Sequence, residues 1–446
     1  MSLNKIAMNG GPLHKLRLYK NRFKLKNHMK IVKRACIAVI LSLLIGALAL
    51  LGWLCNPVDK TAWRVSVHLP IVGVVQFRAF TLIQLATSDV GRKLLNHTQW
   101  KTKHGLVTLE NQADVVQLNC IKCHVNLKGL SSKKVDFDTV NLSVKRVDEA
   151  LSGELSIKSQ AKAMHVLYTA HAHMQGIDIN WTLPSTLLTD LLTPLKTHSA
   201  VIQKAHVTGT LAATGTLHWP SKRWSAKPVI ENFDVTGLGT EKLRTGSANY
   251  TCPQPNKNAI NIATTSQVWL DKKDIGRWLP MAVIIAEDAK FRHHHGYDLE
   301  TLSYLLAQEQ PHKQLGGSTI SQQLAKYFFT GGEHLWIRKI NELLYAVEME
   351  STLGKDRILN LYLNTVDWGP GICGAYDASQ YYFAVNPNQL NAVQAAWLGG
   401  IVRNPHYAWA EQYLTNQPDY RRIEEITRFM PASARNLPLQ LSYAKQ

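Results

Sequence analysis

The pattern of hydrophobic and polar positions changes twice along the chain. Residues 35–54 form an uncharged apolar run whose length suits a helix that crosses the hydrocarbon core of a bilayer. Beyond it, apolar and polar side chains alternate with the period of two that half-buried strands show. Such stretches are residues 115–127, 135–147, 165–179 and 201–218. The alternation predicts a β-rich domain over residues 56–265, with helical segments at 74–96 and 185–195.

Helical periodicity replaces this alternation near residue 265. From 275 to 407, apolar side chains recur every three or four positions and strand signals almost disappear. We therefore expect a multidomain α+β protein with four parts. They are a basic arm at 1–34, a transmembrane helix at 35–55, a β-rich domain at 56–265 and a mainly α domain at 266–446.

The charge distribution predicts how the apolar run is oriented. The formal net charge is +18, and residues 1–34 carry ten Lys or Arg and no Asp or Glu. Because positive flanks stay in the cytoplasm, we expect a single-pass anchor in the inner membrane with the bulk of the chain in the periplasm. A cleaved signal peptide is the alternative, although Leu54-Cys-Asn-Pro57 resembles a cleavage site poorly. The adjacent membrane span explains the basic arm without a nucleic-acid partner.

The cysteines leave two states open. Cys373 stands alone in the C-terminal part, whereas Cys120, Cys123 and Cys252 lie in the exported middle region. An oxidising compartment permits a disulfide between Cys252 and either of the other two, with free thiols as the alternative. Residues 120–124 match the c-type haem attachment pattern. We nevertheless expect no haem, because side chains three positions apart on a strand point to opposite faces.

A pair of acidic residues marks the start of the helical part. Residues 281–291 read as an apolar helix whose end carries Glu287 and Asp288. Partial desolvation there would raise a carboxyl pKa toward that of a useful general base. The alternative is a helix that ends in ordinary surface acids.

Hydroxyl and cationic side chains follow in the next two segments. Residues 316–319 read as a glycine turn and a hydroxyl cap, a helix start that favours anions, and Lys326 lies two turns further on. Arg338 and Glu342 are four residues apart on a predicted helix, with Lys339 beside them; alone, such a pair is typical of an exposed salt bridge. A base opposite fixed cations suits a sugar transfer with a phosphate-bearing leaving group.

Taken in order, four blocks within residues 278–407 resemble the biosynthetic peptidoglycan glycosyltransferases. The family patterns EDxxFxxHxG, GxSTITQQxxKN, RKxxE and KxxILxxYLN lie at 287–296, 316–327, 338–342 and 355–364. The resemblance implies a lysozyme-like, inverting enzyme that polymerises lipid II and releases undecaprenyl diphosphate. We expect it to be monofunctional, because too few residues follow the glycosyltransferase region for a transpeptidase domain. The resemblance also implies that the partners are lipid II, the growing glycan strand, the membrane and other cell-wall synthesis proteins.

The resemblance also assigns roles to individual positions. Glu287 would take the proton from the acceptor sugar's 4-hydroxyl. Glu342 would lie beside the diphosphate with a divalent cation, Mg²⁺ or Mn²⁺. The positions expected to bind substrate are Asp288, Ser318, Thr319, Gln322, Lys326, His334, Arg338 and Lys339. The positions expected to support them are Phe291, His294, Gly296 and Asn364.

Four positions depart from the family patterns. Ser321 and Tyr327 replace the usual Thr and Asn, and Gln394 stands where Glu is common. His334 replaces an Arg that contacts the donor phosphate in relatives, and it is a weaker cation at neutral pH. The departures leave open a catalytically weak or inactive scaffold that binds lipid II or glycan. A lytic transglycosylase is the other alternative, although it would not need cations that bind a diphosphate.

Overall fold

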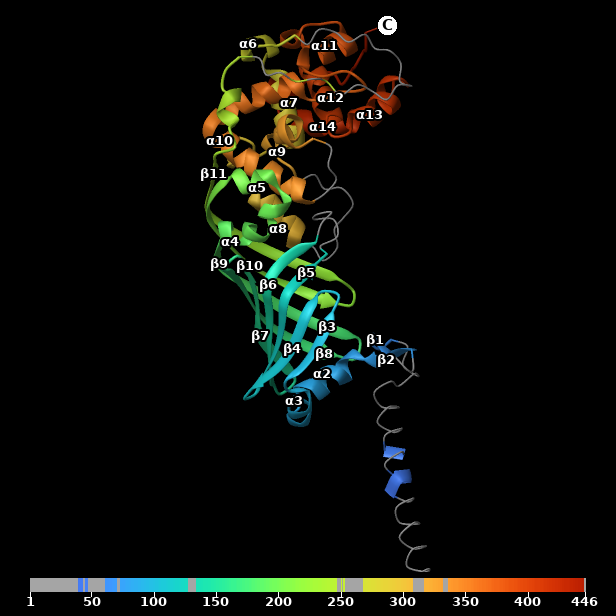
Figure 1. Ribbon diagram of the computed structural model, residues 1–446. Helices are drawn as coiled ribbons and strands as arrows, with labels where there is room; N and C mark the ends of the chain where they lie inside the picture. Colours follow the sequence, from blue (N-terminus) through green and yellow to red (C-terminus); the bar gives the residue numbers. More distant parts are fainter. Residues whose placement is uncertain are drawn as a thin grey trace, which may run out of the picture. The chain divides into compact units, whose positions relative to one another are not determined.

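The computed structural model divides the chain into two compact units, Met1–Ser88 with Ala172–Gly176, and Asp89–His171 with Ile177–Gln446 (Figure 1). The residues that the structure describes are 39–42, 45–46, 61–69, 73–126, 134–246, 250, 252, 268–307, 317–331 and 336–444. In these ranges, no helix has the length and apolar character needed to span a bilayer. The predicted membrane helix at 35–55 falls largely outside them, as does the basic arm, and both stay predictions.

The smaller unit contains a hairpin and a helix. β1 (Arg64–Leu69) pairs antiparallel with β2 (Gly73–Arg78), and α2 (Ala79–Thr87) follows directly. The helix predicted at 74–96 is therefore wrong over its first residues, because the Val-Val pair there joins a strand ladder, where β-branched side chains pack well. The remainder forms two helices, α2 and α3 (Asp89–Leu95), with a break at Ser88.

Nine antiparallel strands form the second sheet, in which every strand lies beside its neighbour in sequence (Figure 1). They are β3 (Thr98–Thr102), β4 (Gly105–Gln112), β5 (Val115–Val125), β6 (Val135–Val147), β7 (Ala150–Ser159), β8 (Lys162–His173), β9 (Gly176–Leu187), β10 (His206–Trp219) and β11 (Arg223–Thr236). The register aligns one apolar row across five strands, formed by Leu109, Leu118, Leu142, Leu155 and Val166. The adjacent row is polar, formed by Thr108, Asn119, Asn141, Ser156 and His165. The predicted β-rich region is thus confirmed, with apolar and polar side chains on opposite faces.

Short helices cover one end of this sheet. Between β9 and β10 lie α4 (Leu188–Leu192), η1 (Thr193–His198) and α5 (Ala200–Lys204). Ser199 caps α5 by accepting a hydrogen bond from Ile202 N at 3.1 Å. Ile202 packs in one buried cluster with Val135 and Val235 of the sheet and with Leu344 of the helical part. The sheet and the helical part therefore share a hydrophobic core at this end.

Helices dominate the chain from residue 268 onward. They are α6 (Lys272–Ile275), α7 (Trp278–Glu287), α8 (Leu299–Ala307), α9 (Ile320–Ala325), η3 (Lys326–Thr330), α10 (Trp336–Thr365), α11 (Ala375–Phe383), η4 (Pro387–Gln389), α12 (Ala392–Ile401), α13 (Pro405–Ala408), η5 (Trp409–Tyr413), α14 (Tyr420–Arg428) and α15 (Ala432–Arg435). The long α10 contains a kink at Gly354, whose φ of 72° favours glycine. The expected mainly α character of this part is confirmed, whereas its likeness to lysozyme stays a prediction.

A buried carboxylate joins the end of the sheet to α10. Glu348 is 2% exposed, and its two carboxylate oxygens accept hydrogen bonds from Leu238 N at 2.7 Å and Thr240 N at 3.3 Å. The hydroxyls of Thr240 and Thr352 lie 2.8 Å apart beside it. These contacts fix the turn after β11 on the helix that also carries Arg338, Lys339 and Glu342.

Replacing Glu348 by Ala is expected to lower the free energy of unfolding by about 2–3 kcal/mol, because two buried amides lose a charged acceptor. Urea unfolding of the detergent-solubilised chain measures the change. Glu241→Ala, an exposed carboxylate in η2 (Thr240–Leu243) of the same turn, is the matched control and should stay within about 0.5 kcal/mol. Equal losses of unfolding free energy in both variants would contradict a stabilising role for the hydrogen bonds to Glu348.

The disulfides differ from the expected pairing. Cys252 bonds to Cys373 and Cys120 bonds to Cys123, with Cα atoms 5.8 Å apart in each pair. The prediction that Cys252 pairs with Cys120 or Cys123 is wrong, and Cys373 is not alone. Lys122 has a φ of 52°, which interrupts the strand alternation between the two cysteines and allows the side chains of Cys120 and Cys123 to meet.

Candidate active site

Glu287 is the last residue of the apolar helix α7. Gln323 Nε2 donates a hydrogen bond to its Oε2 at 2.8 Å, and Tyr362 Oη in turn donates to Gln323 Oε1 at 2.8 Å. Burial raises the pKa of the Glu287 carboxyl, while the Gln323 hydrogen bond and the charges of Arg403 and Arg422 oppose the rise. The carboxylate is thus oriented and partly desolvated, as a general base requires.

Asp288 makes its hydrogen bonds within the fold, and its expected contact with substrate stays a prediction. It is 7% exposed, and its oxygens lie 2.9 and 3.0 Å from His294 Nε2. Its Oδ2 also accepts a hydrogen bond from Ile320 N at 2.9 Å. Asp288 therefore ties the segment after α7 to the start of α9, and the partly buried His294 is its side-chain partner.

The other supporting positions hold backbone in place. Phe291 is fully buried, and Gly296 has a φ of 90°. A Cβ on Gly296 would lie 2.9 Å from the carbonyl carbon of Ala346, so only glycine fits there. Asn364 accepts from Leu270 N at 2.8 Å and donates to Leu270 O at 3.0 Å. These residues support the site without facing its opening.

Thr319 and Gln322 form the N-terminal cap of α9 and do not line the main cleft. Gln322 N donates to Thr319 Oγ1 at 3.2 Å, and Thr319 N donates to Gln322 Oε1 at 3.1 Å, which completes a capping box. Thr319 Oγ1 also donates to Gly296 O at 2.8 Å. Both side chains are bound by backbone amides at the helix start, and their expected contact with substrate stays a prediction.

A cationic cluster lies on α10 and the segment before α9. Lys339 Nζ is 2.7 Å from Glu342 Oε2 and donates to Ser318 Oγ at 3.1 Å. Arg338 Nη1 is 3.2 Å from Glu342 Oε1, and Glu342 itself is 1% exposed. Lys326 is exposed on η3. The buried carboxylate therefore holds two cations in place, and a third cation lies on η3.

Glu342 does not offer the ligand set that a divalent cation needs. Both of its carboxylate oxygens face cationic groups, whereas Mg²⁺ and Ca²⁺ prefer a shell of six or more oxygens. Within the described ranges, no three His, Cys, Asp or Glu side chains are grouped so that they could hold a metal. The side chains present do not fit a metal held by the protein. The divalent cation stays a prediction, and no reaction step is assigned to it.

One cleft of about 880 Å³ brings the two glutamates together. Its lining includes Tyr250, Glu287, Ser318, Gln323, Lys326, Tyr327, Lys339, Glu342, Asp367, Arg403, His406 and Arg422. Sequence reasoning missed six of these, Tyr250, Gln323, Asp367, Arg403, His406 and Arg422. Of these six, only Gln323 lies inside one of the four blocks. It is next to Gln322, which the resemblance assigns to substrate binding. His334 lies outside the described residues, and Arg338 reaches the cleft lining only through Glu342.

Two of the departures from the family patterns have a local explanation. Tyr327 lines the cleft and makes an edge contact with Tyr250, with ring centroids 5.8 Å apart. Burial raises the pKa of Tyr327, which keeps its hydroxyl neutral at physiological pH. Gln394 forms a capping box with Asn391 at the start of α12, a role that Glu also fills.

If Glu287 is the base of the expected sugar transfer, replacing Gln323 by Leu should change how kcat/KM depends on pH. The acid limb of this pH profile should move to higher pH. The variant removes a hydrogen bond that lowers the Glu287 pKa, so the base becomes protonated at a higher pH than in the wild type. Rates measured between pH 5 and 9 test this. Gln322→Ala is the matched control, because its side chain belongs to the helix cap; its acid limb should not move. A limb that stays or moves to lower pH in Gln323→Leu would contradict the assignment.

Comparison with known proteins agrees with the four blocks. Residues 256–428 match the family described as Transglycosylase. The biosynthetic peptidoglycan transglycosylase of Thiobacillus denitrificans is 38% identical over 213 residues, which cover 47% of this chain and 88% of that protein. Proteins of the same name from Nitrosomonas eutropha and Vibrio parahaemolyticus are 40% and 43% identical over 31% of this chain. The chain spans about three fifths of their length, 58% and 62%. The chain belongs to the biosynthetic peptidoglycan transglycosylase family.

Proposed function

We propose that this protein polymerises lipid II into glycan strands and releases undecaprenyl diphosphate. The observation that carries the proposal is that Glu287 and the Lys339–Glu342 pair line one cleft, although they come from different helices. A base on one side and fixed cations on the other match the two needs of the reaction. The acceptor hydroxyl must lose a proton, and the leaving diphosphate must carry added charge.

Glu287 performs the proton transfer in this proposal. The acceptor's 4-hydroxyl attacks the anomeric carbon of the donor, and its proton passes to the Glu287 carboxylate as the new glycosidic bond forms. The bond from the anomeric carbon to the diphosphate oxygen breaks on the opposite face, so the configuration inverts. Gln323 orients the carboxylate, and partial burial makes it a stronger base than an exposed glutamate.

The cationic cluster stabilises the leaving group. Lys339 and Lys326 line the cleft and would meet the diphosphate oxygens as negative charge moves onto them. Glu342 holds Arg338 and Lys339 at fixed positions, and Ser318 accepts a hydrogen bond from Lys339. Cations that are fixed before the reaction need little reorganisation when the bond breaks.

The proposal includes an anchor in the inner membrane at residues 35–55, with the catalytic part in the periplasm. The apolar run and the basic arm before it support this orientation. An anchor would keep the cleft near a substrate whose lipid lies in the same membrane. Other cell-wall synthesis proteins stay predicted partners.

The test is an assay of the detergent-purified full chain with labelled lipid II, run beside preformed glycan that carries no lipid. Each is incubated with Mg²⁺, with Mn²⁺ and with a chelator. We expect long glycan strands from lipid II and no cleavage of the preformed glycan. Cleavage of the glycan would favour a lytic enzyme, and binding of lipid II without product would favour the scaffold.

A further inference from the structure

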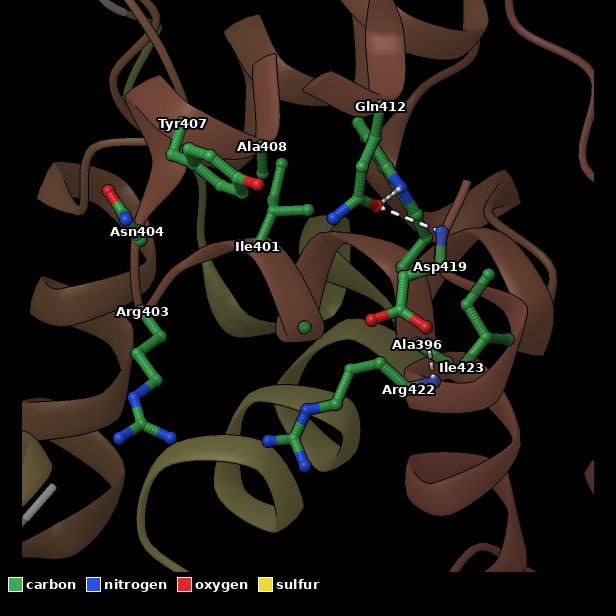
Figure 2. Close-up of a pocket in the computed structure, with 12 residues that line it drawn as sticks. Ala396, Ile401, Arg403, Asn404, Tyr407, Ala408, Gln412, Asp419, Arg422 and Ile423 are labelled. Carbon is green, nitrogen blue, oxygen red and sulfur yellow. Dashed lines mark hydrogen bonds between the residues drawn. The ribbon is translucent and has the colours of Figure 1, made fainter. Parts of the chain in front are cut away.

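A second cavity, of about 650 Å³, lies among α12, α13, η5 and α14 (Figure 2). Its walls combine apolar side chains such as Ile401 and Ala408 with the ring of Tyr407 and the amide of Asn404. None of the four sequence blocks lines it. The proposed polymerisation leaves this pocket without a role.

Two arginines join this pocket to the main cleft. Arg403 and Arg422 line both cavities, so the pocket adjoins the cleft that Glu287 lines. Figure 2 shows both guanidinium groups at the same end of the pocket, away from Gln412. Arg422 is held in place, because its Nη2 donates to Ala286 O at 3.1 Å and its Nη1 lies 3.2 Å from a carboxylate oxygen of Glu425.

The polar groups at the other end of the pocket serve the fold. Gln412 Oε1 accepts hydrogen bonds from Trp397 Nε1 at 3.0 Å and Asp419 N at 3.1 Å. Asp419 caps α14 by accepting from Arg422 N at 3.0 Å. The residues that line this pocket thus include two arginines and one carboxylate, a net positive charge.

The position of the two arginines points to a carboxylate rather than the leaving diphosphate. In the proposed reaction the diphosphate meets Lys326 and Lys339, whereas the two arginines of the same cleft also line the second cavity. Peptidoglycan is a glycan that carries peptides, so its precursor brings a peptide with carboxylates close to the reacting sugar. The planar guanidinium fork matches a carboxylate in two parallel hydrogen bonds.

We propose that Arg403 and Arg422 bind a carboxylate of the peptide on the glycan substrate and that the second cavity receives this peptide. The inference rests on the proposed function, because it names a further part of the same substrate. The bound peptide would position the sugar whose hydroxyl or anomeric carbon reacts beside Glu287. The two arginines would then bind the substrate's peptide, while Glu287 acts on the sugar and the lysines of the cleft act on the diphosphate.

Three lipid-linked substrates test the proposal: the natural one, one whose peptide carboxylates are amidated, and one without a peptide. Dissociation constants and KM are measured for the full chain and for Arg403→Gln. Arg403 is chosen because Arg422 also holds the last turn of α7. The matched control is Arg421→Gln, an arginine of α14 with an 88% exposed side chain that pairs with Glu425.

We expect the wild type to bind the natural substrate about tenfold more tightly than the other two, the loss typical of one charged hydrogen bond. Arg403→Gln should bind all three equally weakly, and Arg421→Gln should behave as the wild type. Wild-type binding that ignores the peptide would overturn the proposal. So would an Arg403→Gln variant that loses the same factor on every substrate, since the arginine would then act on the diphosphate or on Glu287. If no substrate is polymerised, the proposed function fails, and the dissociation constants still decide this inference.

Discussion

Replacing Glu287 by Gln is expected to lower the polymerisation rate about 10²–10⁴-fold, the contribution typical of a positioned general base. Glutamine keeps the size of the side chain and cannot accept the hydroxyl proton. Gln323, which fixes the carboxylate at 2.8 Å, also remains able to contact the new side chain. Initial rates of strand formation from labelled lipid II, with the dissociation constant of lipid II measured separately, test the prediction.

Glu300→Gln is the matched control for this variant. Glu300 is an exposed carboxylate on α8 that pairs with Lys290, so its loss should leave the rate unchanged. A Glu287→Gln rate within tenfold of the wild type would show that another group takes the proton.

The stability of Glu287→Gln tests whether misfolding, rather than loss of the base, explains a lower rate. Because burial raises the folded-state pKa of Glu287, its ionisation destabilises the fold; the penalty is complete above the folded pKa and absent below the unfolded one. Glu287→Gln should therefore unfold at a higher temperature than the wild type at pH 8. The difference should close as the pH falls below the unfolded value of about 4.3.

Replacing Lys339 by Met is expected to lower kcat by about 10²–10³-fold, as the loss of one fixed group that stabilises developing charge typically does. Lys339 Nζ lies 2.7 Å from Glu342 and 3.1 Å from Ser318, which hold it in the cleft before substrate arrives. The negative charge of the diphosphate grows as the bond breaks, so the loss should fall mainly on kcat and only weakly on KM.

Two further variants complete this test. Lys339→Arg keeps the charge and should retain more activity than Lys339→Met. Lys272→Met removes an exposed lysine that pairs with Asp356 outside the cleft, and its rate should match the wild type. A Lys339→Met variant that changes KM alone would contradict a role in the transition state.

The periodicity of apolar residues predicted the strands and helices whose structure depends mainly on their own sequence. The alternation in residues 135–147 became β6, because side chains of opposite character face opposite sides of the sheet. The apolar helix predicted at 281–291 formed as α7, which begins at Trp278 and already ends at Glu287. The Val-Val pair of β2 failed as a helix because its partner strand, β1, is a tertiary contact that local periodicity does not contain.

Some residues of the candidate site could be predicted from the sequence, and others are brought there only by the tertiary fold. Glu287, Lys339 and Glu342 lie in blocks with recognisable spacing, and the structure brings them to one cleft. Arg403 lies in the turn after α12 and Arg422 lies on α14, and both come to this cleft through folding alone. Their spacing in the sequence therefore does not predict them. The Cys252–Cys373 bond is likewise a contact across 121 positions, which composition and compartment do not specify.

In the proposed mechanism, one cleft joins proton removal at Glu287 to departure of the diphosphate beside Lys339. Glycosidic bonds formed and undecaprenyl diphosphate released can be followed in the same reaction, for the wild type and for Glu287→Gln. We expect one diphosphate released for each bond in the wild type, and loss of both products in the variant while lipid II still binds. Diphosphate release without strand growth, or equal products from both proteins, would contradict this mechanism.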